Sequence, residues 1–294
     1  MKPKLSIIII NFNAEKFLVE CLDSIYAQTK QISFDIWVVD NNSIDASVPM
    51  VQQNFPQVNL IENKENIGFA KANNQSIARC TGDYILILNP DTLILQNAIE
   101  KAVDFLDRNS TVGICGCKVL NENGTLQLAC RRSIPTPRVA FFRLTGLSRL
   151  FPKSEIMAKY NLTYLGPDSP HQVDAVSGAF LMIRKEVVEG IGLLDERFFM
   201  YGEELDWCLR AKKAGWTVMY YPCAEIIHYK GECSKFNHRK AAFEFYRSMY
   251  LFHKKHFADT YNPLINFIIY TGIFLKAFMS WRSFIFPAKV GSKR

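Results

Sequence analysis

The sequence lacks several motifs that would each identify a class of function. Its eight cysteines include no CxxC pair and lie within otherwise apolar segments, so we predict reduced core thiols rather than a zinc site or a disulfide framework. The strand-to-helix joins carry neither a Walker loop nor a GxGxxG motif, which argues against P-loop and dehydrogenase interpretations. The first residues lack a secretory apolar region and a small-residue cleavage site, so we expect the body of the protein in the cytoplasm.

An excess of positive charge is also missing from the first 229 residues, which hold 23 Lys and Arg against 25 Asp and Glu. The remaining residues hold 12 against 3, so the net charge of +7 arises in the C-terminal part. That part is rich in aromatic and aliphatic side chains, and we therefore expect an anionic membrane surface as its partner and no nucleic acid. The length of 294 residues suits one large domain with an appendage.

The apolar pattern of the first half predicts alternating strands and helices. Residues 5–10 form an unbroken apolar run, typical of a parallel strand buried on both faces, and residues 34–39 and 84–88 repeat it. Residues 17–25 between the first two runs have helical apolar spacing. We predict an α/β fold of Rossmann-like type, with a mixed, mostly parallel sheet flanked by helices. A later strand, residues 217–221, should end at Pro222.

Polar side chains follow the predicted strands where ligands gather in open α/β sheets. Pro90 should end its strand and place Asp91 off the carboxyl end, where the carboxylate is either a metal ligand or a polar loop residue. Asp40 follows the second strand, and a turn or helix cap competes there with a contact to a ribose or base. His228 sits where another loop leaves the sheet, as a plain hydrogen-bonding residue or a metal ligand.

A second acidic group occurs in the sequence FFMYGEELDW. Glu203, Glu204 and Asp206 suit the start of a helix, where the dipole stabilises carboxylates. The preceding aromatic residues would also bury them, and burial raises a carboxylate pKa toward the range of a general base. Both interpretations stand on the residues alone.

Residues 131–171 carry five prolines and no clean period. A connection of that length in a compact domain is usually functional or mobile.

Taken in order, these motifs resemble the family 2 glycosyltransferases with the GT-A fold, especially their rhamnosyltransferase-like branch. The resemblance covers about residues 4 to 235. It rests on SIIIINFN, WVVDNNSIDAS, NIGFAKANN, GDYILILNPD, SGAFLMIRKEV, FFMYGEELDWCLRAKKAGW and HYKG.

The resemblance implies a nucleotide-sugar donor and a divalent cation. The Asp-X-Asp metal motif of the family falls on Asn89-Pro90-Asp91, so Asp91 remains as the charged ligand and His228 would complete the set for Mg²⁺ or Mn²⁺. Asp83 would lie near the base or ribose. The implied donor-binding residues are Asn11, Asp40, Asn66, Lys71, Asp83 and Asn89.

The resemblance also implies an inverting transfer. The Glu-Asp motif of the family falls on Glu203-Glu204, which makes Glu204 the implied base, with Asp206 as the competing candidate. The expected donor is dTDP-L-rhamnose, and the expected acceptor is a lipid-linked saccharide of a cell-surface polysaccharide. A different class of function, a nucleotide-sugar-binding or scaffolding protein without turnover, remains as the alternative.

We expect two units: a catalytic domain over residues 1–236 and a basic, aromatic-rich helical tail over residues 237–294. Residues 263–286 approach the length of a membrane span, but Lys276 and Arg282 interrupt them. We therefore expect helices in the membrane interface, which would hold the protein on the inner face of the cell membrane. The alternative is a helix packed on the domain or in a homodimer.

Overall fold

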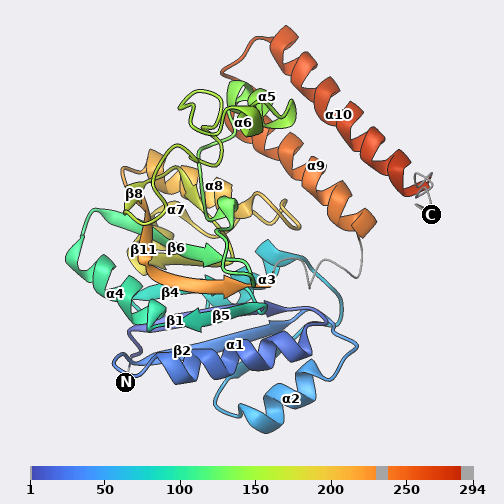
Figure 1. Cartoon of the computed structure of the whole chain (residues 1–294). Helices are drawn as coiled ribbons and strands as arrows, with labels where there is room; N and C mark the ends of the chain where they lie inside the picture. The colour runs from blue at the N-terminus through green and yellow to red at the C-terminus, as the bar shows by residue number, and fades with distance from the viewer. Residues whose placement is uncertain (1, 230–237, 286–294) are drawn as a thin grey trace, which may run out of the picture.

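The computed structural model describes residues 2–229 and 238–285 (Figure 1). Its centre is a nine-stranded sheet with the strand order β3-β2-β1-β4-β10-β6-β11-β5, and β8 pairs with β11. The first four strands run parallel to one another: β1 (Leu5–Asn11), β2 (Phe34–Asp40), β3 (Asn59–Glu62) and β4 (Tyr84–Leu88). The predicted mixed, mostly parallel sheet flanked by helices is confirmed.

Three helices connect the parallel strands: α1 (Glu15–Gln28), α2 (Ser47–Asn54) and α3 (Phe69–Ile77). Parallel connections are right-handed, so the two that lead from β1 outward to β3 place α1 and α2 on one face of the sheet. The return from β3 to β4 reverses direction and places α3 on the other face (Figure 1).

The second half of the sheet is mixed. The strand β10 (Phe180–Arg184) runs antiparallel to both β4 and β6 (Val112–Leu120). The strand β11 (Thr217–His228) is parallel to β6 and antiparallel to β5 (Thr92–Leu95). The sequence analysis predicted no strand β5, which is followed by the helix α4 (Ala98–Arg108).

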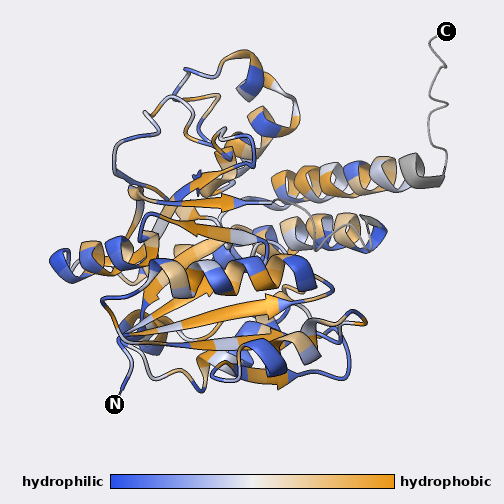
Figure 2. Cartoon of the chain, turned by 60° about the horizontal axis from the view of Figure 1, so that its bottom comes forward, coloured by the Kyte–Doolittle hydropathy of each residue, from blue (hydrophilic) through white to orange (hydrophobic). Residues whose placement is uncertain are grey.

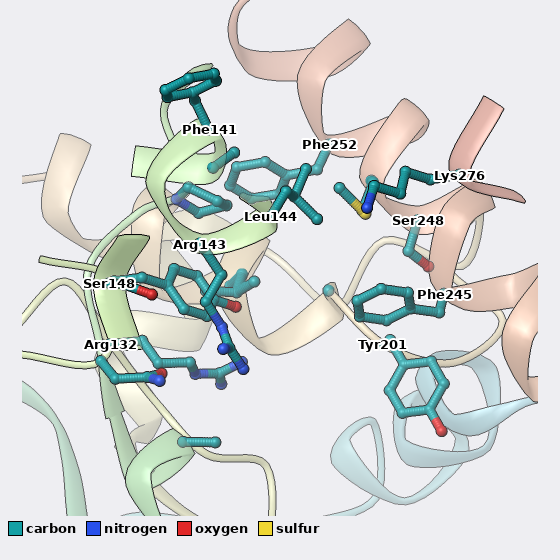
Figure 3. Close-up of a pocket in the computed structure, with 18 of the residues that line it drawn as sticks. Arg132, Phe141, Arg143, Leu144, Ser148, Tyr201, Phe245, Ser248, Phe252 and Lys276 are labelled. Atoms are coloured by element: carbon teal, nitrogen blue, oxygen red, sulfur yellow. The ribbon is translucent and has the colours of Figure 1, made fainter. Parts of the chain in front are cut away.

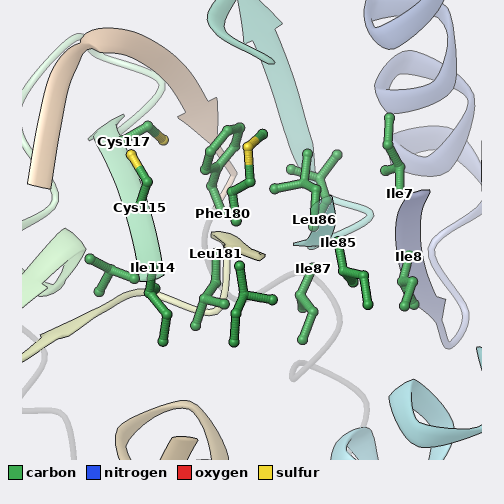
Figure 4. Packing of buried hydrophobic residues seen from close by; sticks show 14 of the residues in the cluster. Ile7, Ile8, Ile85, Leu86, Ile87, Ile114, Cys115, Cys117, Phe180 and Leu181 are labelled. Atoms are coloured by element: carbon green, nitrogen blue, oxygen red, sulfur yellow. The ribbon is translucent and has the colours of Figure 1, made fainter. Parts of the chain in front are cut away.

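The core lies along the central strands, whose side chains are apolar on both faces (Figure 4). Leu86 of β4 and Leu181 of β10 are fully buried, and so is Ile114 of β6. Six of the seven cysteines within the described residues are buried free thiols, as expected, whereas Cys223 is exposed. This unbroken apolar layer makes the strand ends the place where polar groups can gather.

The prediction that Pro222 ends a strand is wrong. The strand β11 continues through Pro222 to His228, with a register shift against β6 between Tyr221 and Glu225. A proline is tolerated at such a bulge because its missing N–H is not needed for the ladder. As a result His228 pairs with Thr92 of β5 in the register, one residue after Asp91.

The long connection after β6 folds over one end of the sheet. It contains a 3₁₀ turn (Leu128–Cys130), β7 (Arg131–Arg132), α5 (Pro137–Leu144), α6 (Leu147–Leu150) and β8 (His171–Gln172). The strand β7 pairs with β9 (Ala175–Val176) in a separate two-stranded sheet. Thr136 caps α5 by accepting a hydrogen bond from the Val139 N–H, and Pro137 occupies the first helical turn.

The C-terminal half holds α7 (Lys185–Ile191), α8 (Glu203–Lys213), α9 (His238–His256) and α10 (Pro263–Ile285). The helix α9 packs on the body of the protein: Phe252 and Ser248 are buried, and the Ser248 hydroxyl donates to the Met200 carbonyl at 3.0 Å. The packed alternative therefore holds for α9. The predicted boundary between residues 236 and 237 lies outside the described residues.

The helix α10 lies beside α9 and projects from the body (Figures 1 and 2). Asn266 fixes its start: its amide oxygen accepts from the His253 ring at 2.7 Å, and its amide nitrogen donates to the Ala258 and Tyr261 carbonyls. Residues 263–281 are long and apolar enough to cross a membrane, with a mean hydropathy of 1.5 and none of the segment buried. Phe267 and Phe274 expose about two thirds of their surface.

Candidate active site

The carboxyl ends of β1 and β2 hold the first predicted pair. Asn11 and Asp40 are register partners, and the Asn11 amide donates to the Asp40 carboxylate at 2.8 Å. Asp40 also accepts from the Ser43 backbone N–H at 2.8 Å and from the Ser43 hydroxyl at 2.6 Å. The turn interpretation of Asp40 is therefore realised in the structure. The buried side-chain oxygen of Asn11 has no partner, which leaves one acceptor at this edge for a ligand.

The second group lies at the end of β4, where β11 also ends. The His228 Nε2 atom lies 3.2 Å from an Asp91 carboxylate oxygen and 3.2 Å from the Asn89 amide nitrogen. The other ring nitrogen of the imidazole contacts Gln127: the Gln127 Oε1 atom is 3.0 Å from His228 Nδ1. Three residues that the sequence placed in separate motifs thus meet at one strand end.

Gln127 fixes the tautomer of His228. Its amide nitrogen donates to the His228 carbonyl at 2.6 Å, so its oxygen must accept from the protonated Nδ1. The Nε2 lone pair of the neutral ring is then directed toward Asp91 and Asn89. The Asp91 Oδ1 atom is buried and accepts no hydrogen bond. An imidazole nitrogen that contacts only the Asn89 amide, beside an unsatisfied carboxylate oxygen, is a donor set that fits a divalent cation.

No group of three or more His, Cys, Asp or Glu residues that could hold a metal occurs within residues 2–229 and 238–285. Asp91 and His228 therefore supply two protein ligands. Mg²⁺ and Mn²⁺ commonly take their remaining oxygen ligands from substrate phosphates and water, so two protein ligands suffice for a site that forms with the donor.

Asp83 does not join this group, and its predicted contact with the base or ribose is wrong. It precedes β4, whereas Asp91 follows it, so the two carboxylates lie at opposite edges of the sheet. Asp83 pairs with Lys2 at 2.6 Å, and Lys4 lies 3.9 Å away. The physical reason is chain direction, because only residues after a parallel strand reach the carboxyl edge.

Asn66 and Lys71 flank the start of α3. The Asn66 side chain accepts from the Gly68 N–H at 3.1 Å, and Lys71 is exposed on the helix. Gly68 has φ +88°, and a Cβ placed there would meet the Phe199 carbonyl oxygen at 2.7 Å. The same carbonyl accepts from the Phe69 N–H at 2.7 Å. The segment before α8 is thus fastened to the start of α3.

Glu204, the predicted base, lies in the first turn of α8 behind Gly202. One carboxylate oxygen accepts from Arg132 Nη2 at 2.7 Å, and the other accepts from the Gly202 N–H at 3.1 Å. Arg132 is 8% exposed and also donates to the Val176 carbonyl. Burial lowers the pKa of Arg132, but the attraction of Glu204 and the nearby Tyr160 outweigh it and raise that pKa above its ordinary value.

Glu203 is buried, and one of its carboxylate oxygens has no partner. Burial, followed by repulsion from Glu204, raises the pKa of Glu203 well above the ordinary range. The two adjacent glutamates therefore differ in their surroundings. Glu204 forms an ion pair with Arg132, whereas burial disfavours the charged form of Glu203.

Asp206 faces away from these groups, toward α9. It accepts from Arg210 at 2.9 Å, from Lys255 at 2.6 Å and from His256 at 2.7 Å. Burial raises the pKa of Asp206, but the hydrogen bonds from His256 and Lys255 outweigh burial and lower it. A carboxylate with three cationic or ring-nitrogen partners joins α8 to α9, and this placement does not support the competing prediction of a base.

A large cavity of about 1780 Å³ extends from Glu204 to the inner side of α10 (Figure 3). Glu204, Arg132 and Tyr201 line it near α8, and Gln127 lines it toward His228. The residues of α5 and α6 cover one side, and α9 and α10 cover the other. Gln127 lies between this cavity and the group of Asp91 and His228: it lines the cavity and contacts the His228 ring, whereas His228 itself lines a second pocket of about 590 Å³.

Gln127 and Arg132 are residues of the site that the sequence analysis missed. Both lie in the connection after β6, where no period or motif marks them. Their importance depends on pairing with residues about 100 and 72 positions later in the chain, respectively. For Arg132 the only signal was the unusual length and proline content of residues 131–171, which indicated a functional or mobile segment but no residue, and Gln127 lies before that segment.

A family model described as glycosyl transferase family 2 matches residues 6–192. The N-acetylglucosaminyl-diphospho-decaprenol L-rhamnosyltransferase of Mycobacterium tuberculosis is 25% identical over 263 residues, which cover 86% of this chain and 84% of that protein. The low-salt glycan biosynthesis hexosyltransferase of Haloferax volcanii is 29% identical over 232 residues, which cover 78% of this chain and 68% of that protein.

Solved structures share the fold. A mannosyltransferase from Pyrobaculum calidifontis in complex with GDP-Man and Mn²⁺ superposes with a TM-score of 0.60 at 17% identity, covering 95% of this chain and 70% of that one. The S. aureus protein TarS in complex with UDP-GlcNAc gives a TM-score of 0.56 at 17% identity, covering 99% of this chain and 77% of that one. At these identities the likeness establishes the fold alone.

Proposed function

Because the chain belongs to glycosyl transferase family 2, we propose that it moves a sugar from a nucleotide-sugar to a hydroxyl group of a lipid-linked saccharide, with inversion at the anomeric carbon. The observation that carries this proposal is the single cavity that joins Glu204 to the side chain of Gln127, which holds His228 beside Asp91. A base in the cavity and a metal-ligand pair behind Gln127 are the parts that such a transfer requires.

In the proposed step the acceptor oxygen attacks the anomeric carbon while Glu204 takes its proton. The new bond is acceptor oxygen to carbon, and the bond that breaks joins that carbon to the diphosphate, which leaves as the nucleoside diphosphate. Asp91 and His228 would hold Mg²⁺ or Mn²⁺, which when bound supplies positive charge to the leaving diphosphate. Gln127 holds the Nδ1 side of the His228 ring, which directs Nε2 toward Asp91.

Donor residues line the edge beside the metal pair. Asn11 offers its unpartnered side-chain oxygen, and Asp40 holds Asn11 in place, which suits a contact with the nucleoside. Asn89 contributes a neutral amide next to His228. Asn66 and Lys71 at the start of α3 remain proposed donor contacts. The rhamnosyltransferase relative supports L-rhamnose, carried by dTDP, as the donor sugar.

The C-terminal helices complete the proposal. The outward side of α10 carries exposed apolar residues and no described charged residue, whereas Lys276 lines the cavity side. An apolar surface of this extent on an exposed helix suits lipid. We propose that α10 holds the catalytic body against the inner face of the cell membrane, where lipid-linked saccharides are presented. The relative from Mycobacterium tuberculosis, named for a decaprenol-linked acceptor, supports this location.

The test is Glu204→Gln in the full chain, with Glu189→Gln on α7 as the control of equal chemistry. Glu204→Gln should lower transfer about 10²–10⁴-fold while a thermal shift with the donor persists, because only proton removal is lost. A wild-type protein that binds a nucleotide-sugar and never consumes it would instead support a binding protein. A screen of nucleotide-sugars with and without Mn²⁺ tests the donor, and a preference for UDP-sugars would contradict dTDP.

A truncated chain ending near residue 236 tests the membrane role. If the C-terminal helices bind the bilayer, this variant should lose binding to anionic liposomes. Because α9 also covers Asp206, the more selective variant changes only Phe267 and Phe274 to serine. Unchanged liposome binding by both variants would contradict the proposal.

A further inference from the structure

Two arginines approach each other inside the cavity. Arg132 comes from β7, and Arg143 comes from the last turn of α5, where its guanidinium lies 5.9 Å from the centre of the Tyr160 ring. Figure 3 shows the two guanidinium groups pointing toward one another, with Leu144 and Phe252 on the far side of Arg143. Like charges that line one partly apolar cavity repel each other, and an anion bound between them would relieve that repulsion.

The protein itself supplies only part of the balancing charge. Glu204 is the single carboxylate that lines the cavity, and it pairs with Arg132. Within residues 2–229 and 238–285, Arg143, Arg149 and Lys276 have no carboxylate within ion-pair distance, although all three line the same space. The cavity lining thus contains three cations that have no carboxylate partner among the described residues, and one ion pair. This excess of positive charge gives the cavity a strong preference for an anion of high charge.

Arg132 also retains an unused donor. Its side chain is more than nine-tenths buried, two hydrogen bonds leave from Nη2, and the Nε–H has no partner. A buried, charged donor without a partner costs free energy, which a ligand oxygen would recover. The Nε–H group of Arg132 and the guanidinium of Arg143 together mark where an anion would bind, next to the Glu204 side chain that pairs with Arg132.

The wall beyond the arginines is apolar and belongs to the helices proposed to meet the membrane. Phe245 and Phe252 of α9, with Ile265, Ile268 and Ile269 of α10, continue the lining. From the body outward, the cavity thus presents a carboxylate, then two cations, then hydrocarbon. A lipid-linked saccharide has the matching order of hydroxyl-bearing sugar, diphosphate and hydrocarbon chain.

We propose that Arg132 and Arg143 bind the diphosphate of a lipid-diphosphate acceptor, with its first isoprenoid units against α9 and α10. This inference rests on the proposed function and specifies the acceptor side of that site. The donor diphosphate is assigned elsewhere, because Asp91 and His228 lie on the far side of Gln127 from these arginines. A diphosphate between Arg132 and Arg143 would also set the sugar hydroxyl beside Glu204.

The experiment measures binding without turnover. The full chain in detergent and EDTA is titrated calorimetrically with farnesyl diphosphate, and with farnesol as the uncharged counterpart. EDTA removes divalent cations, so the proposed donor site cannot hold the diphosphate through a metal. We expect farnesyl diphosphate to bind at least about 10-fold more tightly than farnesol, since charge-assisted hydrogen bonds are the difference.

Arg143→Ala should weaken farnesyl diphosphate about 10–100-fold and leave farnesol unchanged. Arg143→Glu should weaken it further, because it reverses the charge. The matched control is Arg138→Ala, which removes an exposed arginine from the same helix that does not line the cavity. Arg143 makes no hydrogen bond to the protein through its side chain within the described residues, so both variants should keep the wild-type melting temperature.

Equal affinity for farnesyl diphosphate in Arg143→Ala and wild type would overturn the proposal. So would binding that needs Mn²⁺ and disappears in Asp91→Asn, since that would place the diphosphate at the donor side. Failure of the proposed function gives a different result: no nucleotide-sugar is consumed, while lipid diphosphate still binds in an Arg143-dependent way. The two ideas can therefore fail separately.

Discussion

The two halves of the site are built in different ways. On the donor side, polar residues follow buried strands and are held by local turns, as Asp40 is held by Ser43. On the acceptor side, Glu204 depends on Arg132, which is 72 residues earlier in the chain and belongs to an irregular connection. The first half is rigid because the sheet fixes it, whereas the second is assembled from segments that only tertiary contacts bring together. Local sequence patterns can therefore locate the first half, whereas the second half becomes visible only in the folded protein.

Among the substitutions that test the difference between the two halves, Asp91→Asn should have the largest effect. The substitution removes the charged ligand from the donor half and should lower transfer about 10²-fold or more, because metal charge stabilisation is worth several kcal/mol. The stabilisation of the protein by Mn²⁺ with nucleoside diphosphate, followed by thermal shift, should disappear as well. Undiminished transfer at saturating Mn²⁺ would contradict the role of Asp91.

Asp206→Asn should destabilise the acceptor half without changing the residues that are proposed to carry out the transfer. Three partners would lose a buried carboxylate, and we expect a loss of about 3 kcal/mol in the free energy of unfolding. Because the folded-state pKa of Asp206 is lowered, its stabilising effect is present above about pH 4 and is lost as pH falls further. Denaturant unfolding across this range should show a shallower acid limb in the variant.

Below its melting temperature, Asp206→Asn should keep a transfer rate close to the wild-type rate. A loss as large as that of Glu204→Gln would restore Asp206 as the candidate base. If a lower temperature restored the stability of this variant but not its transfer rate, the conclusion would be the same.

Glu203→Gln should act in the opposite direction, by stabilising the protein. Glu203 has a raised pKa in the folded state, so its folded form loses stability as pH rises above the unfolded pKa of about 4.3. Glutamine keeps the shape and never ionises. The melting temperature should rise at neutral pH, by about 2–4 °C for each kcal/mol recovered. The gap to wild type should close toward about pH 4, and a constant gap would indicate a packing effect instead.

Asp83→Asn tests whether the role of a carboxylate depends on which end of the strand it occupies, because Asp83 precedes β4 and Asp91 follows it. The side chain of Asp83 is half exposed and its partners are surface lysines, so stability should change by less than about 0.5 kcal/mol. Transfer and donor affinity should equal those of wild type. A weakened donor would show that the amino edge of the sheet reaches the nucleotide after all.

Local sequence patterns predicted the fold well where an apolar run marked a strand and the polar residues after it marked the end of that strand. The apolar runs of β1, β2 and β4 indicated buried parallel strands, and chain direction then placed Asn11, Asp40 and Asp91 at one edge. The nucleoside contact of Asp83 was implied by the resemblance alone, and chain direction argues against it because Asp83 precedes its strand. Pro222 showed the limit of single-residue rules, because a bulge accommodated it and carried β11 on to His228.

The rest could not be predicted because it depends on pairing between distant residues. No local signal distinguishes Arg132 from its neighbour Arg131, yet only Arg132 contacts Glu204. The assignment of Glu204 over Asp206 followed from which partner each found, an arginine in a cavity or a cluster on α9. Charge and hydropathy indicated a lipid-facing tail but could not show that α9 belongs to the body.

The grip of Arg132 and the Gly202 N–H on Glu204 has a consequence for the speed of the reaction. Each carboxylate oxygen accepts one hydrogen bond and keeps lone pairs for an incoming hydroxyl group, but the plane of the carboxylate is fixed before any ligand arrives. A base that is already aimed loses no time or donor in finding its direction. An Arg132→Lys variant, which keeps the charge but not the fork of donors, should leave that plane free to turn and should lower the rate of transfer.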